Sequence, residues 1–152
     1  MSHRLIAALS LATALVAGPA LAEWRHAAAP MGQFEGGVAL EGDTAGIGYG
    51  CADSYATLDF YAKGIHVAAG ESVIRVDGQE VARGNTQYNS LPDLTRFSLK
   101  VQRSYGPGGW TQYNAAINAL ASGTEAIWET PTGETFTFPL AGSAKVRSCL
   151  MR

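Results

Sequence analysis

Cysteine is scarce in this chain: only Cys51 and Cys149 occur among the 152 residues. Neither belongs to a Cys-x-x-Cys motif, which excludes a thioredoxin-type redox pair. Two isolated cysteines most simply form one structural disulfide when the compartment is oxidising. A reactive thiol is the alternative if the compartment is reducing.

Several motifs that carry chemistry are also missing. The sequence has no Gly-x-Ser-x-Gly nucleophile elbow and no phosphate loop ending in Gly-Lys-Ser or Gly-Lys-Thr. No predicted helix carries two metal-ligating side chains one turn apart, and Glu41, Asp43 and Asp53 are too sparse for a calcium loop. We therefore expect no metal or cofactor, and we expect these carboxylates to be ordinary surface groups.

Charge of either sign is not in large excess. The chain has 11 Lys and Arg against 13 Asp and Glu, a formal net charge of −2, and it contains no basic run. Nucleic acid is therefore not an expected partner.

Long hydrophobic runs are limited to one, residues 5–16. Pro19 and the small-x-small triplet Ala20-Leu21-Ala22 follow it, which is the pattern of a secretory signal peptide over residues 1–22. We expect cleavage near Ala22 and a periplasmic or secreted mature chain that begins near Glu23. An uncleaved anchor is the alternative, although the run is short for a bilayer. No second such segment follows, so we expect no stable membrane insertion after cleavage.

The exported part divides into a loose lead-in, residues 23–33, and a single domain, residues 34–152. Short apolar-alternating runs separated by turn signals predict an all-β fold, an antiparallel β-sandwich or small barrel. The predicted strands cover residues 34–40, 45–51, 55–62, 72–76, 79–82, 97–101, 125–130 and 134–140. Asp77-Gly78 predicts a type I′ hairpin, residues 84–93 a polar loop, and Trp128 a core position.

Two helices complete this prediction. Residues 112–121 form the internal helix, with Thr111 as its N-cap and Gly123 as its stop. Its buried stripe consists of Tyr113, Ala116, Ile117 and Leu120. A short C-terminal helix brings Val146, Cys149 and Leu150 onto one face.

Binding residues are most plausible around the glycine-rich segment 106–109. Arg103, Tyr105, Trp110 and Tyr113 flank this segment, which reads as a flexible loop. Arginine and aromatic side chains dominate binding hot spots, and loops on a rigid scaffold often carry function. The alternative is that Trp110 folds back to cover the core.

Catalytic residues are harder to find. A hydrolase would need His66 to meet an acid such as Asp53 or Asp59 in one pocket, and nothing in the sequence specifies that meeting. We expect His66 to be a solvent-facing or hydrogen-bonded loop residue instead.

Four features in order carry a family resemblance. They are the strand ending at Cys51, the segment from Ala69 to Gly78, the helix leading to Leu120-Ala-Ser-Gly123, and the ending Phe138-Pro-Leu-Ala-Gly-Ser-Ala-Lys-Val-Arg-Ser-Cys149. The chain resembles the invasion-associated locus B proteins, small exported proteins of Gram-negative bacteria. It departs from them at Tyr49, where tryptophan is more usual, and it lacks the extra cysteines of many members.

The resemblance implies a periplasmic β-sandwich without known catalytic residues, associated with hosts in some members, and it transfers no site residues. We therefore predict a non-enzymatic binding protein whose partner is a protein or another envelope component. An inhibitor or immunity protein against an envelope enzyme is the first alternative, and a hydrolase using His66 is the second.

Overall fold

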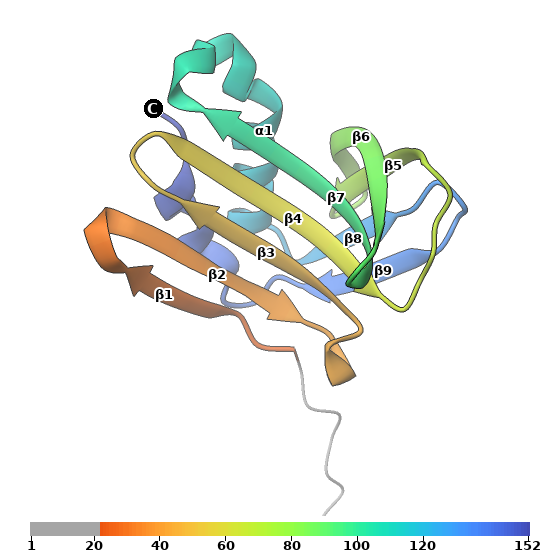
Figure 1. Ribbon diagram of the computed structural model, residues 1–152. Helices are drawn as coiled ribbons and strands as arrows, with labels where there is room; N and C mark the ends of the chain where they lie inside the picture. The colour runs from red at the N-terminus through yellow and green to blue at the C-terminus, as the bar shows by residue number, and fades with distance from the viewer. Residues whose placement is uncertain (1–21) are drawn as a thin grey trace, which may run out of the picture.

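A computed structural model describes residues 22–152, so the predicted signal peptide lies almost wholly outside the described residues. Nine strands form one antiparallel sheet in the order β1-β2-β3-β4-β7-β6-β5-β8-β9 (Figure 1). The all-β prediction is confirmed. The strands make a single curled sheet, however, where a sandwich would have two facing sheets.

The strands are β1 (Arg25–Ala29), β2 (Gln33–Ala39), β3 (Ala45–Cys51), β4 (Tyr55–Lys63), β5 (Gly70–Val76), β6 (Gln79–Ser90), β7 (Asp93–Gln102), β8 (Glu125–Glu129) and β9 (Thr135–Pro139). The helical elements are η1 (Pro30–Gly32), η2 (Glu41–Asp43), η3 (Arg103–Tyr105), α1 (Gly106–Ser122) and η4 (Ser143–Cys149). All of the η elements are 3₁₀ helices.

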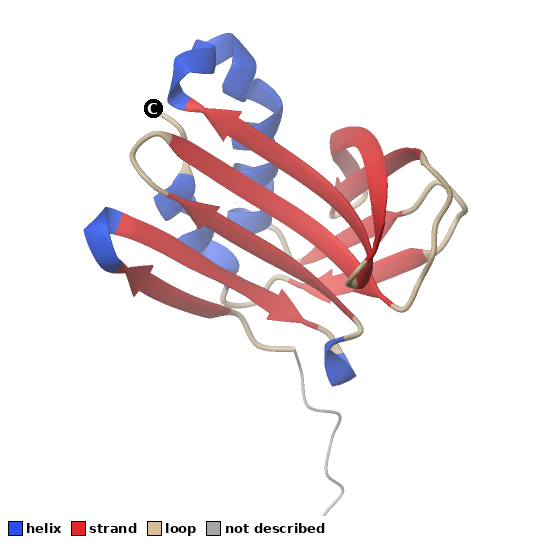
Figure 2. Cartoon of the chain, viewed as in Figure 1, coloured by secondary structure: helices blue, strands red, loops and turns tan. Residues whose placement is uncertain are grey.

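The sheet curls back on itself (Figure 2), and one cluster of buried apolar side chains forms the core. The Phe60 ring on β4 lies 6.4 Å from the Trp128 ring on β8 and 6.1 Å from the Phe138 ring on β9. These strands are far apart in the sheet order, so their aromatic side chains meet only because the sheet bends back on itself. Trp128 is fully buried, as the sequence predicted.

Helix α1 covers one part of the opening in the curl. Its predicted stripe of Tyr113, Ala116, Ile117 and Leu120 is almost completely buried. The helix packs on β6, β7 and η4, and η4 packs on β2 and β3. The chain therefore ends beside the start of α1 and the end of β7 (Figure 1).

The Asp77-Gly78 hairpin is confirmed. Both residues have positive φ, 48° and 82°, as a type I′ turn requires. The Asp77 carboxylate also accepts hydrogen bonds from the backbone N–H groups of Thr124 and Glu125, at 3.1 and 3.0 Å. This turn thereby fixes the start of β8.

Two segments predicted as irregular are strands. The lead-in contains β1, which pairs with β2. Residues 84–93 belong mainly to β6 and β7, which pair around the turn at Leu91-Pro92. The periodicity of residues 84–93 is weak because the inward positions carry Gly84 and Thr86 in place of large apolar residues.

The prediction of a flexible loop at residues 106–109 is wrong. Residues 106–110 are the first turns of α1, not a loop, and Thr111 lies inside the helix, where its hydroxyl donates to the Pro107 carbonyl at 3.3 Å. Proline in the first helical turn costs no hydrogen bond, because that N–H would have no helical partner. Gly142 precedes η4 as its N-cap residue, and the Ser143 hydroxyl donates to the Leu120 carbonyl at 2.6 Å.

Candidate functional site

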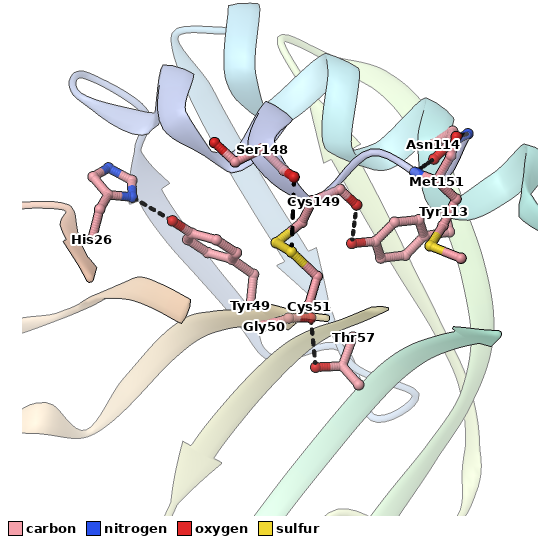
Figure 3. The surroundings of a disulfide bond; sticks show 10 residues. All are labelled: His26, Tyr49, Gly50, Cys51, Thr57, Tyr113, Asn114, Ser148, Cys149 and Met151. Atoms are coloured by element: carbon pink, nitrogen blue, oxygen red, sulfur yellow. Dashed lines mark hydrogen bonds between the residues drawn. A yellow bond between two sulfur atoms is a disulfide. The ribbon is translucent and has the colours of Figure 1, made fainter. Parts of the chain in front are cut away.

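A disulfide joins Cys51, at the end of β3, to Cys149, at the end of η4, with Cα atoms 5.4 Å apart (Figure 3). The predicted pairing is therefore confirmed. Helix α1 holds the same segment through two more residues. The Tyr113 hydroxyl donates to the Cys149 carbonyl at 2.9 Å, and the Asn114 amide exchanges two 3.0 Å hydrogen bonds with the Met151 backbone. The C-terminal segment is consequently well anchored.

A cavity of about 300 Å³ lies beside this disulfide, and we call it the arginine pocket. Its lining includes Phe34, Asp53, Arg103, Arg147, Leu150 and Arg152. These residues come from β2, the β3–β4 turn, η3 and the C-terminal segment. Segments that are distant in sequence thus converge on one small concavity.

The arginine pocket concentrates positive charge. Within residues 22–152, none of its three arginines forms a salt bridge. Arg103 is oriented by its own Nε, which donates to the backbone carbonyl of Asp53 at 2.8 Å. Against the three guanidinium groups the lining offers one side-chain carboxylate, Asp53. The pocket is therefore cationic although the whole chain is slightly acidic.

Exposed aromatic side chains gather at the same end of the molecule. Phe34 is 41% exposed and pairs with Cys51, Tyr55 is 43% exposed and pairs with Gln102, and Tyr105 is 56% exposed at the end of η3. With the arginine pocket they form what we call the disulfide end, made of Phe34, Asp53, Tyr55, Arg103, Tyr105, Arg147, Leu150 and Arg152.

The predicted binding residues fall into two groups. Arg103 and Tyr105 are exposed and belong to the disulfide end. Trp110 and Tyr113 are core residues, 8% and 1% exposed, and the Trp110 indole N–H donates to the Gln102 carbonyl at 2.8 Å. Trp110 thus follows the alternative in which it covers the core.

Sequence reasoning missed Phe34, Arg147 and Arg152 as candidates. One signal could have pointed to the two arginines: they flank Cys149, whose predicted partner Cys51 precedes Asp53 by two positions. A disulfide between these cysteines brings their neighbours together.

A second, larger cavity is an open trough of about 1050 Å³ on β1–β4, which we call the glycine trough. Gly37, Gly48 and Gly50 contribute to it, and its charged residues include Arg25, Glu35 and Asp59. The Asp59 carboxylate accepts a hydrogen bond from Ser98 on β7. Glu23, Glu41 and Asp43 also line the trough, so five acidic residues stand against Arg25. The trough is therefore acidic, whereas the arginine pocket is cationic.

His26 and Tyr49 form a hydrogen-bonded pair at the edge of the glycine trough (Figure 3). The His26 Nε2 lies 2.8 Å from the Gly142 carbonyl, which can only accept, so Nε2 carries a proton. In the neutral imidazole, Nδ1 then accepts from the Tyr49 hydroxyl at 2.6 Å. Burial raises the pKa of Tyr49, which favours its protonated hydroxyl. The pair connects β1, β3 and the segment before η4.

His66 lies apart from both cavities. It is exposed and stacks on the ring of Tyr88, with centroids 3.9 Å apart. Asp59 lines the glycine trough and Asp53 lines the arginine pocket, whereas His66 lines neither cavity. His66 therefore does not share a pocket with either of the acids that a hydrolase would need.

Residues 22–152 hold no cluster of three or more His, Cys, Asp or Glu side chains suited to a metal ion. In the same part of the chain, no helix is long and apolar enough to cross a bilayer. Among known proteins, no family model, no curated protein and no solved structure matches this chain, so its function has to be inferred from the residues around these cavities.

Proposed function

We propose that this chain is a non-enzymatic binding module that contacts a protein partner through its disulfide end. One observation carries the proposal. Three arginines without salt-bridge partners in residues 22–152 converge with exposed aromatic side chains around a small pocket. Arginine and aromatic residues dominate the energetics of protein interfaces.

Rigidity of the disulfide end supports this role. The disulfide, Tyr113 and Asn114 all hold the segment that carries Arg147 and Arg152. Arg103 is oriented by its bond to the Asp53 carbonyl. A surface that is ordered before binding loses less conformational entropy when the complex forms.

A catalytic role is not part of the proposal. The arginine pocket offers cationic donors and apolar walls, while its two cysteines are joined in the disulfide. Export, membership in the invasion-associated locus B family and a contribution to host association remain predictions from the sequence. An inhibitor commonly blocks an enzyme's cleft with a protruding loop, and the glycine-rich segment that could have formed such a loop is helical. No particular observation therefore favours the inhibitor alternative.

Capture of partners from an envelope extract tests the proposal. Wild-type protein is compared with the double variant Arg103→Ala/Tyr105→Ala and with the control Arg75→Ala/Leu91→Ala. The control removes an arginine and an exposed apolar side chain outside the disulfide end. We expect the first variant to lose about tenfold or more of the specific partner while keeping its thermal midpoint. Equal recovery by both double variants would overturn the proposal.

A further inference from the structure

We infer that the arginine pocket receives a carboxylate side chain from an acidic segment of the partner protein. The inference rests on the proposed function, because it names the chemistry recognised at the same disulfide end. It is carried by the charge, the volume and the walls of the pocket.

The charges select an anionic ligand of limited size. Three arginines and one aspartate line the pocket, so the summed charge of its lining side chains is positive. The whole chain has a formal net charge of −2. Beyond a Debye length of about 10 Å, the protein therefore offers no general attraction to a polyanionic surface such as nucleic acid or an anionic membrane. A discrete anionic group that enters the pocket gains the local attraction.

The guanidinium groups suit a carboxylate. Arginine presents a planar fork of N–H donors that binds carboxylate oxygens in pairs. In Arg103 the Nε is already occupied by the Asp53 carbonyl, which fixes the side chain and leaves its terminal nitrogens as donors. Arg147 is exposed and forms no side-chain hydrogen bond within residues 22–152. Both arginines line the arginine pocket, so both are available to a carboxylate that enters it.

The volume and walls favour a peptide over a free ion. A cavity of about 300 Å³ is at the small end of ligand pockets and holds one or two side chains. Phe34, Leu150 and Met151 add apolar wall beside the arginines. Tyr105 continues that apolar surface outside the pocket. An acidic residue with apolar neighbours in its own chain would use both kinds of contact, whereas a free ion would use only the arginines.

Fluorescence anisotropy with a labelled peptide of alternating Glu and Leu residues tests the inference. The matched control peptide carries Gln in place of Glu, and the protein is used with its disulfide intact. We expect the Glu peptide to bind about tenfold or more tightly than the Gln peptide, because hydrogen bonds between two charged groups are stronger than those of a neutral amide. Binding should weaken as salt is raised, since the contacts are ionic.

Protein variants locate the site. Arg147→Gln should weaken Glu-peptide binding about tenfold, while the control Arg75→Gln should leave it unchanged. Arg147 makes no side-chain hydrogen bond in the described chain, so its replacement should not disturb folding. Arg103→Gln is a second variant, checked by its thermal midpoint. An equal loss in Arg75→Gln, or equal binding of the Gln peptide, would overturn the inference.

Two further outcomes separate this inference from the proposed function. Competition by inorganic phosphate at concentrations below the dissociation constant of the peptide would overturn the carboxylate assignment. The second outcome is that the Glu peptide fails to bind while partner capture still depends on Arg103 and Tyr105. That result would overturn the carboxylate inference and leave the proposed function standing. If partner capture does not depend on those residues, both conclusions fail.

Discussion

The indole nitrogen of Trp24 donates a hydrogen bond to the carbonyl oxygen of Pro139 at 2.8 Å, across 115 positions of sequence. Trp24 directly precedes β1, and Pro139 ends β9, the two strands at opposite ends of the sheet order. Trp24 is also buried and stacks on His26, with ring centroids 6.0 Å apart. This single side chain therefore ties together the two edges of the curled sheet.

Replacing Trp24 by phenylalanine should destabilise the fold. The ring is retained, but the hydrogen bond is lost and the Pro139 carbonyl loses its partner, so the free energy of unfolding should fall by about 1–3 kcal/mol. Trp24→Ala should cost more, about 3–5 kcal/mol, because packing is lost too. Urea denaturation measures both. A Trp24→Phe variant as stable as wild type would show that the contact is dispensable.

Loss of the disulfide should affect stability and binding together. Cys51 and Cys149 are 98 positions apart, and closing a loop of that length removes unfolded-state entropy equivalent to about 4–5 kcal/mol. The Cys51→Ala/Cys149→Ala variant should unfold at much lower urea concentration. Binding of the Glu peptide should also weaken, since the segment that carries Arg147 and Arg152 would lose its covalent anchor. A stability loss below about 1 kcal/mol would contradict the entropic account.

Two paired glycines should respond oppositely to alanine. Gly37 and Gly48 are cross-strand partners on β2 and β3, and neither has a positive φ. A Cβ at Gly48 would meet nothing within 4 Å, so Gly48→Ala should stabilise the strand by about 0.5–1 kcal/mol. A Cβ at Gly37 would lie 2.2 Å from the Ile47 carbonyl oxygen, so Gly37→Ala must displace backbone. Urea denaturation of both variants measures the two changes in the free energy of unfolding. Equal destabilisation by Gly37→Ala and Gly48→Ala would contradict this prediction.

Stability should fall at alkaline pH. Burial raises the pKa of Tyr113, and burial together with Asp43 raises the pKa of Tyr61 to about 12. In the unfolded chain both phenols ionise near pH 10. The stabilisation that these raised pKa values give the folded state is thus fully present below about pH 10. It is lost as the pH rises toward the folded-state pKa values. Urea denaturation between pH 8 and roughly 12 should show this decline.

Tyr113→Phe supplies the matched variant for the alkaline effect. It removes one buried phenol and its hydrogen bond to the Cys149 carbonyl. The variant should be less stable at neutral pH, by about 1–2 kcal/mol, yet lose stability less steeply above about pH 10. If the free energy of unfolding falls with pH as steeply in the variant as in wild type, the pKa of Tyr113 is the same in the folded and the unfolded chain.

Local sequence signals predicted the elements whose stability is local. The Asp77-Gly78 turn follows from the positive φ values that a tight hairpin needs. The buried stripe of α1 follows from its 3.6-residue spacing. The strand ending at Cys51 follows from its alternation of inward and outward residues.

Elements that depend on distant partners were predicted less well. Strand β1 carries no apolar alternation and is ordered by pairing with β2 and by the anchor at Trp24. The start of α1 was misassigned because its glycines favour a loop, while its burial of Trp110 favours a helix. Tertiary contacts can override weak local propensities of this kind.

The sequence by itself determined that this chain forms antiparallel strands with one internal helix, because apolar alternation and turn chemistry act locally. It also determined the partner of Cys51, because Cys149 is the only other cysteine. Only the tertiary structure decided that the strands form one curled sheet. It also decided that Arg103 faces the same pocket as Arg147 and Phe34. Such meetings depend on the bend of the whole sheet and on where the C-terminal segment docks, which no short-range pattern encodes.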